Sequence, residues 1–83
     1  MCSSDLRSVA QEEAANGITV NMILPGVIRT APLTRSAALL ARSIPARRLG
    51  TPQEVARAAL FLLSHESGYI TGSALTLSGG FLI

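Results

Sequence analysis

The sequence predicts an α/β fold whose elements follow in the order helix, strand, helix, helix, strand. Two short apolar runs, residues 18–24 and 74–78, have the composition and the flanking turn residues of β-strands. Between them, a capping sequence opens a strong helical pattern over residues 52–64. Because strand, helix and strand follow one another, we expect the two strands to be parallel neighbours in one sheet.

The first expected element is a helix from Arg7 to Asn16, composed mostly of good helix formers. Asn16-Gly17 then supplies a left-handed stop. Residues 18–24 first alternate and then become continuously apolar, as in a parallel strand covered on both faces. Pro25-Gly26 is expected to end this strand.

An extended loop is expected over residues 27–33, because the β-branched pair Val27-Ile28 and Ala31-Pro32 disfavour a helix. Thr34 is the expected N-cap of a short helix that extends to about Arg42.

The longest predicted helix runs from Pro52 to Ser64 and begins with a full capping box. Thr51 is its N-cap, Pro52 its first residue, and Glu54 the side chain that reaches back. Its second half is apolar nearly all round, so it must pack on the sheet and on something else. Turns then lead to the last strand, which ends at Gly79-Gly80.

The composition is typical of a folded segment with much apolar surface to bury. The 83 residues are 48% hydrophobic and 14% charged, against about 25% charged in an average domain, which excludes a disordered tail. Two strands and three helices cannot cover both faces and edges of a sheet, so we expect the apolar faces to need further neighbours. No apolar run approaches the roughly 18 residues of a membrane span.

Charge and cysteine content limit the chemistry. Seven arginines, no lysine and five acidic residues give a net charge of +2, and the arginines are spread along the sequence, so nucleic acid is not an expected partner. A membrane is not an expected partner either, because no apolar run is long enough to span one. Cys2 cannot form an internal disulfide and His65 is the only histidine, so we expect no metal site and a reducing, cytoplasmic setting. Any mechanism that needs a lysine must find it outside this chain.

The start of the chain has neither the basic nor the apolar region of a signal peptide. Back-translated, Cys2 to Leu6 reads through the end of a common sequencing-library adapter. We therefore expect residues 1–6 to be a non-native scar and the native sequence to begin near Arg7.

Four stretches, in the same order, resemble the C-terminal portion of the short-chain dehydrogenase/reductase family, from about Arg7 to Leu82. They are residues 16–21 (NGITVN), 25–30 (PGVIRT), 48–56 (RLGTPQEVA) and 69–76 (YITGSALT). The resemblance implies that residues 7–83 form the C-terminal part of one Rossmann-like, doubly wound parallel sheet. It also implies that this domain binds NAD or NADP and transfers a hydride between the cofactor and a carbonyl or alcohol substrate. The choice between the two cofactors, and the substrate itself, stay open.

The family's glycine-rich loop and its catalytic Ser, Tyr and Lys would all precede Arg7. The resemblance therefore places no catalytic residue in this chain, and we expect the isolated chain to be inactive. One position departs from the family pattern, since Ser78 stands where an Asp usually precedes the final Gly79-Gly80.

The candidate cofactor-binding residues are Pro25, Gly26, Ile28 and Thr30. They leave the carboxyl end of a parallel strand, where ligands bind in open α/β sheets. Gly26 permits close backbone approach, Ile28 can present its peptide N–H and C=O to a planar carboxamide, and the Thr30 hydroxyl can donate. In the family this pattern lines the nicotinamide end, with Pro25 beside the ring. The alternative is a plain Pro-Gly turn with Thr30 as a local cap.

Residues 31–49 resemble the family's substrate-covering segment. Its apolar lining would come from Leu33, Ala37, Leu40 and Ile44, which alternatively only pack a helix on the sheet. Tyr69 is interpreted as structural, because it lacks a Lys at the fourth following position. His65 is interpreted as a solvated cap at a helix C-terminus rather than as a general base. Arg47-Arg48 is interpreted as solvated rather than bound to a substrate anion.

The resemblance further implies a homo-oligomer, expected to be a tetramer, that assembles through the helix 52–64 and the last strand. A competing hypothesis is a non-enzymatic interaction module that docks this face onto full-length family subunits. A third hypothesis, an unrelated small nucleotide-binding domain, is disfavoured because the glycine-rich fingerprint is missing.

Overall fold

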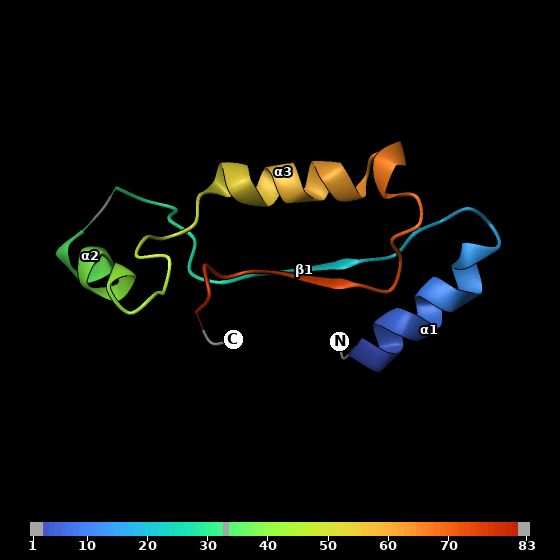
Figure 1. Ribbon diagram of the computed structural model, residues 1–83, viewed down its shortest axis with the longest axis horizontal. Coiled ribbons are helices and arrows are strands. Elements are labelled where there is room, and N and C mark those ends of the chain that lie inside the picture. Colours follow the sequence, from blue (N-terminus) through green and yellow to red (C-terminus); the bar gives the residue numbers. More distant parts are fainter. Residues whose placement is uncertain (1–2, 33, 82–83) are drawn as a thin grey trace.

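The computed structural model describes residues 3–32 and 34–81. Its elements are α1 (Ser3–Ala14), β1 (Met22–Pro25), α2 (Arg35–Ala41), α3 (Pro52–Leu62), the 3-10 helix η1 (His65–Ser67) and β2 (Ala74–Leu77). The predicted order of helix, strand, helix, helix and strand is thus confirmed, with η1 as an addition (Figure 1).

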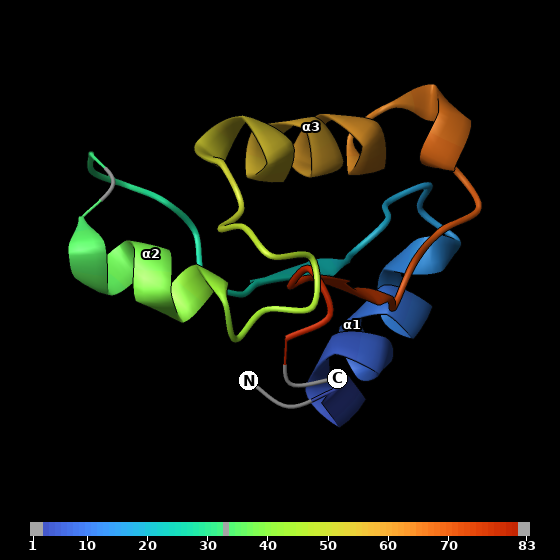
Figure 2. The same ribbon diagram turned by 60° about the vertical axis from the view of Figure 1, so that its left-hand side comes forward.

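The sheet consists of β1 and β2, which pair in parallel with Met22 opposite Ala74 and Pro25 opposite Leu77. The predicted parallel crossover is therefore confirmed. Helix α3 lies over one face of the sheet, and α1 lies on the other side, near the amino ends of the strands (Figures 1 and 2). Helix α2 lies beyond the carboxyl ends.

The first strand is shorter than the predicted 18–24 and continues through Pro25, which was expected to end it. Before Met22, side-chain hydrogen bonds add to a single backbone bond, in which the Gly72 N–H donates to the Val20 carbonyl at 2.8 Å. The Val20 N–H donates to the Thr71 hydroxyl at 3.0 Å, and the Asn21 amide donates to the Ile70 carbonyl at 3.0 Å. The prediction that both faces are covered is wrong for the described residues, since Leu24 is 43% exposed.

Helix α1 begins at Ser3, before the predicted Arg7, and ends two residues before the predicted Asn16. Its buried side chains are Leu6 and Ala10, and Gly72 packs next to Ala10. The predicted left-handed stop is present at Gly17, whose φ is +75°. That residues 1–6 are non-native stays a prediction.

Helices α2 and α3 are capped as the sequence predicts. The Thr34 hydroxyl accepts the Ala37 N–H at 3.1 Å. In α3 the Thr51 hydroxyl accepts the Glu54 N–H, and the Glu54 carboxylate accepts the Thr51 N–H at 3.1 Å. Helix α3 ends at Leu62 rather than at Ser64, because the buried Ser67 hydroxyl donates to the Leu62 carbonyl and turns the chain into η1.

The core is small. Among residues 3–32 and 34–81, the buried apolar side chains are Leu6, Ala10 and Ile44. Ile44 lies in the turn after α2, where Ala46 donates its N–H to the Gly79 carbonyl at 2.9 Å and so joins this turn to the end of β2. Large apolar side chains of α3 are exposed, in keeping with the expectation that these faces need neighbours. None of the described helices is long and apolar enough to cross a membrane.

Candidate functional site

The predicted cofactor-binding residues lie where the two parallel strands end. The carboxyl ends of β1 and β2, the first turn of α3 and the segment leading to α2 meet at this end of the molecule (Figures 1 and 2). Ligands of open α/β sheets bind at this kind of edge. Pro25 is the last residue of β1 and is exposed there.

Gly26 holds the two strand ends close together. Its N–H donates to the Leu77 carbonyl at 2.8 Å, one residue beyond the end of β1. A Cβ at this position would lie 3.0 Å from the Cα of Ser78, a tighter contact than nearly all side chains make. Glycine at this position therefore favours the close approach of β1 and β2.

Ile28 presents an unused donor and acceptor. It forms an isolated parallel bridge with Gly50, in which Gly50 donates to the Val27 carbonyl at 3.0 Å and Arg29 donates to the Gly50 carbonyl at 2.8 Å. In extended backbone the N–H and C=O of one residue point to the side opposite those of its neighbours. The N–H and C=O of Ile28 thus point away from Gly50, and neither has a partner within the described residues.

Thr30 is exposed, and its hydroxyl has no hydrogen-bond partner in residues 3–32 and 34–81. The alternative role as a local cap therefore finds no hydrogen bond in the structure. Thr30 lines a hollow of about 430 Å³ between its own loop and the first turn of α3. The other lining residues are Arg29, Ala31, Pro32, Thr51, Pro52 and Gln53.

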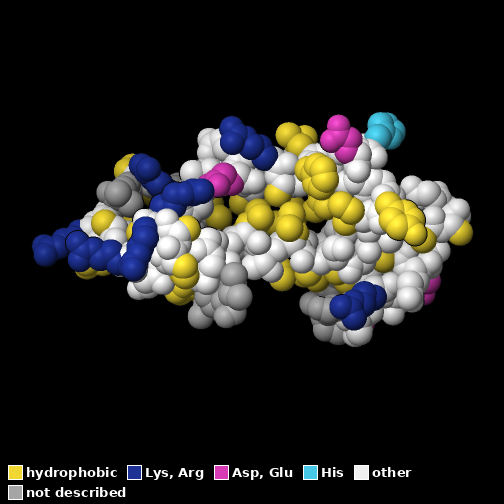
Figure 3. Space-filling model, in the orientation of Figure 1, with side chains coloured by type: hydrophobic (Ala, Val, Ile, Leu, Met, Phe, Trp, Pro, Cys, Tyr) yellow, Lys and Arg dark blue, Asp and Glu magenta, His cyan; other side chains and the backbone are white. Residues whose placement is uncertain are grey.

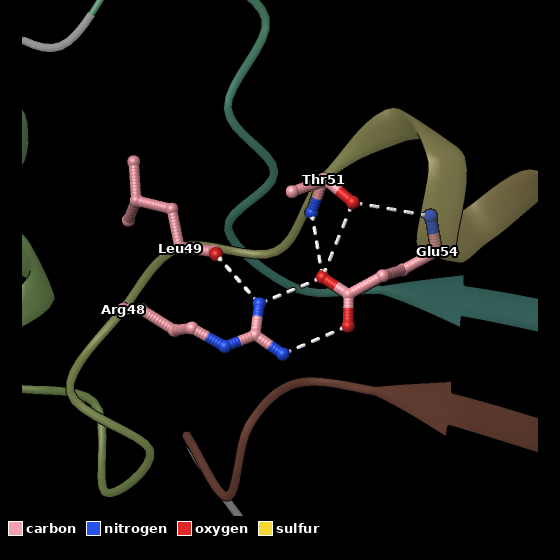
Figure 4. A network of polar contacts seen from close by, with 4 residues as sticks. All are labelled: Arg48, Leu49, Thr51 and Glu54. Carbon is pink, nitrogen blue, oxygen red and sulfur yellow. Dashed lines mark hydrogen bonds and ion pairs between the residues drawn. The ribbon is translucent and has the colours of Figure 1, made fainter.

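A polar network that the sequence analysis missed fixes the other wall of this region (Figure 4). The Arg48 guanidinium donates to both oxygens of the Glu54 carboxylate, at 2.7 and 2.8 Å, and also to the Leu49 carbonyl. The hydrogen bond from Arg48, followed by that from the Thr51 backbone, lowers the pKa of Glu54 to about 2. The Glu54 carboxylate in turn raises the pKa of Arg48.

The capping box identified Glu54 but not its second partner. The sequence could have suggested a cationic partner, because a carboxylate that accepts the Thr51 N–H keeps further lone pairs for a cation. A cavity of about 310 Å³ lies beside this pair and is also lined by Ile28, Thr76 and Ser78. Ser78, the departure from the family pattern, uses its hydroxyl to accept the Gly80 N–H at 3.3 Å.

The residues predicted to form the apolar lining of the segment 31–49 differ in their exposure. Ile44 is buried in packing, Ala37 is half-buried and Leu40 is 39% exposed, whereas Leu33 lies outside the described residues. Tyr69 is fully exposed. His65 is exposed at the start of η1, after α3 has ended, and not in the last turn of α3.

Comparison with known proteins agrees with this architecture. The family model described as enoyl-(acyl carrier protein) reductase matches residues 2–82. A crystal structure of a short chain dehydrogenase from Bacillus anthracis superposes with a TM-score of 0.84 at 36% identity, covering 98% of this chain and 33% of that one. This chain belongs to the short-chain dehydrogenase/reductase family.

Other family members are also similar to this chain. The 3-oxoacyl-[acyl-carrier-protein] reductase FabG of Escherichia coli is 48% identical over 80 residues, with 89% of this chain and 32% of that protein aligned. The structure of YwfH, an NADPH dependent reductase involved in bacilysin biosynthesis, has a TM-score of 0.83 at 29% identity and covers 94% of this chain and 35% of that one. The chain thus spans about a third of the length of these relatives. The predicted Rossmann-like fold class and the family resemblance are both confirmed.

Proposed function

We propose that Pro25, Gly26, Ile28 and Thr30 hold the nicotinamide end of NAD or NADP in an oxidoreductase that acts on a carbonyl or alcohol substrate. The observation that carries this proposal is the free N–H and C=O of Ile28 at the carboxyl end of the sheet. A carboxamide offers one acceptor and two donors in a plane, so it matches this pair. When bound, the nicotinamide supplies or accepts the hydride.

The residues of this chain bind and orient the cofactor, and the proton-transfer groups are supplied by the rest of the domain. Tyr69 is exposed and has Ser73, not Lys, at the fourth following position. The chain contains no lysine to lower the pKa of a tyrosine. We therefore propose that residues 7–83 are the C-terminal part of one NAD(P)-binding domain, and that the chain alone is inactive.

A graft onto a relative tests the cofactor site. Residues 7–83 would replace the matching last third of the E. coli reductase, and NADPH- and NADH-dependent reduction of a 3-oxoacyl thioester would be followed. Thr30→Ala is expected to raise the KM for the cofactor about five- to tenfold, which corresponds to the loss of one hydrogen bond. Thr30→Ser keeps the hydroxyl and should leave this KM unchanged. Thr19→Ala is the matched control, because Thr19 is exposed near the amino end of β1. Equal cofactor KM values for Thr30→Ala and Thr19→Ala would refute the assigned role.

We further propose that the protein assembles into a homo-oligomer, a tetramer, through the helix 52–64 and the last strand. The support is the outer surface at the end of α3, where Leu60 is 66% exposed and Leu63 is 83% exposed. Exposed apolar side chains that lie together mark association surfaces. Sedimentation velocity of the grafted protein should show a tetramer that Leu60→Arg with Leu63→Arg dissociates, whereas Leu39→Arg on α2 leaves it intact.

A further inference from the structure

The turn that follows α1 contains an asparagine followed directly by a glycine. Asn16 and Gly17 are both exposed, as are all residues from 14 to 19. A Cβ added to Gly17 would meet no described atom within 4 Å. The turn lies at the end of the molecule opposite α2 (Figure 1). Solvent therefore reaches the Asn16 side chain and the Gly17 backbone, and the turn has room to change its conformation.

The hydrogen bonds that hold this turn are all local. The N–H groups of Asn16 and Ile18 donate to the Glu13 carbonyl, at 3.0 and 3.3 Å, and the Gly17 N–H donates to the Ala14 carbonyl at 3.1 Å. The side-chain amide of Asn16 donates to the Glu13 carboxylate at 3.3 Å. Exposed helix ends of this kind open locally at little cost in free energy. The Gly17 nitrogen can thus be released without any change in the sheet.

The second asparagine of the chain, Asn21, is held in a different way. Its amide donates to the Ile70 carbonyl at 3.0 Å, and its carbonyl oxygen accepts the Ser73 N–H at 3.1 Å. The next residue, Met22, is paired with β2. Release of the Asn21 side chain therefore requires the beginning of β1 to separate from the turn before β2.

We propose that Asn16 is a site of spontaneous deamidation. The backbone nitrogen of Gly17 attacks the side-chain amide carbon of Asn16, which forms a cyclic imide between the two residues. The side-chain nitrogen leaves as ammonia, together with the proton of the Gly17 amide. Glycine favours this step because it has no Cβ beside the attacking nitrogen and adopts many backbone conformations. Water then opens either carbonyl of the imide, which gives aspartate or isoaspartate at position 16.

Deamidation places a negative charge at an unfavourable position. The new carboxylate lies next to the Glu13 carboxylate, which accepts a hydrogen bond from the Asn16 amide before the reaction. It also follows the carboxyl end of α1, where the helix dipole disfavours an anion. The net charge of +2 decreases by one unit. Deamidated protein should therefore separate from unmodified protein by ion exchange, and its α1 should be less stable at this end.

Peptide mapping by mass spectrometry tests the proposal on the 83-residue protein, incubated at neutral pH. The rate at Asn16 should lie within about tenfold of the rate in a synthetic peptide of residues 13–19, because the turn opens readily. Gly17→Ala should slow the reaction at least about tenfold, since the added Cβ hinders the nitrogen. It should do so although Ala is strained at this φ of +75°, which makes the turn easier to open.

Either of two results would overturn the proposal. One is a rate at Asn16 that is more than about tenfold below the rate in the peptide, because the fold would then protect the turn. The other is a Gly17→Ala variant that reacts as fast as the unsubstituted protein, because Gly17 would then not be the attacking residue.

Met22→Gly provides a matched control within one molecule, because both asparagines are then followed by glycine. Asn21 should react at least about tenfold more slowly than Asn16 in this variant, since its side chain must first leave Ile70 and Ser73. Equal rates in the folded variant would mean that the fold does not distinguish the two sites, and the proposal would be wrong. Circular dichroism checks that the variant is folded. If it is unfolded, the comparison of the unsubstituted protein with its peptide decides the question.

Discussion

The guanidinium of Arg48 forms a bidentate ion pair with the carboxylate of Glu54, with N–O distances of 2.7 and 2.8 Å. The same carboxylate accepts the Thr51 N–H, so one side chain joins the loop before α3 to the first turn of that helix. Gly50 lies within this loop and bridges to Ile28. The network therefore fixes the strand-like segment whose free N–H and C=O we assign to the cofactor.

The Arg48–Glu54 pair makes stability depend on pH in the acidic range. The folded pKa of Glu54 is lowered from 4.5 to about 2, so its stabilising contribution is present above pH 4.5 and is lost as the pH falls toward 2. Thermal unfolding followed by circular dichroism should show a midpoint that falls across this window, and Glu54→Gln should flatten that part of the profile. Because both side chains are exposed, we expect the effect to shrink in high salt.

The control for this prediction is Glu66→Gln, which removes an exposed carboxylate on η1. It should leave the slope between pH 5 and pH 2 as in the unsubstituted protein. A profile for Glu54→Gln that overlays the Glu66→Gln profile would mean that Arg48 does not stabilise the folded state.

Thr51 caps α3 with its hydroxyl, which accepts the Glu54 N–H. Thr51→Ala is expected to lower the free energy of unfolding by about 1 kcal/mol, the usual cost of a lost N-cap, and Thr51→Ser should restore most of it. Urea denaturation measures both, with Thr19→Ala as the exposed control. If Thr51→Ala is as stable as this control, the cap contributes nothing to stability.

Local signals predicted much of this structure, and contacts between distant residues account for what they missed. The capping box at Thr51 and Glu54 found α3, because every group that it needs lies within four residues. The start of β1 was misplaced because Asn21 is held by residues about fifty positions later in the chain. No local pattern reports such a partner.

The same distinction applies to the candidate site. Position at the end of a strand was sufficient to select Gly26 and Ile28, since ligand sites follow strand ends. The bridge from Ile28 to Gly50 explains why the Ile28 peptide groups are free, and it arises from chain segments 22 residues apart. Likewise, the arginines that are dispersed along the sequence gather at the end of the molecule that carries α2 (Figure 3), where the Arg47 guanidinium donates to the Arg42 carbonyl.

Asn21 joins the beginning of β1 to the turn before β2. Its amide donates to the Ile70 carbonyl at 3.0 Å, and its carbonyl oxygen accepts the Ser73 N–H at 3.1 Å. Asn21→Ala leaves both backbone groups without their partner, so we expect a loss of about 1–2 kcal/mol in the free energy of unfolding. Asn21→Asp should also destabilise, because a second oxygen then faces the Ile70 carbonyl.

Asn16→Ala is the matched control for Asn21, since Asn16 is exposed and bonds only to nearby Glu13 through its side chain. Urea denaturation of the three variants should give a loss at Asn21 that clearly exceeds the loss at Asn16. Similar losses at the two positions would show that the link between the β1 start and the β2 turn is not stabilising.

Gly79 and Gly17 both have left-handed backbone, with φ of +62° and +75°, but their surroundings differ. A Cβ on Gly79 would lie 3.1 Å from side-chain carbons of both Ile44 and Ala46, whereas a Cβ on Gly17 would meet nothing within 4 Å. Gly17→Ala should cost about 1 kcal/mol for the backbone conformation alone. Gly79→Ala should cost a further 1–3 kcal/mol, approximately, from crowding against the buried Ile44. Urea denaturation compares the two variants directly. Equal losses would mean that the turn after α2 adjusts to the added methyl group, and that the end of β2 does not hold this turn in place.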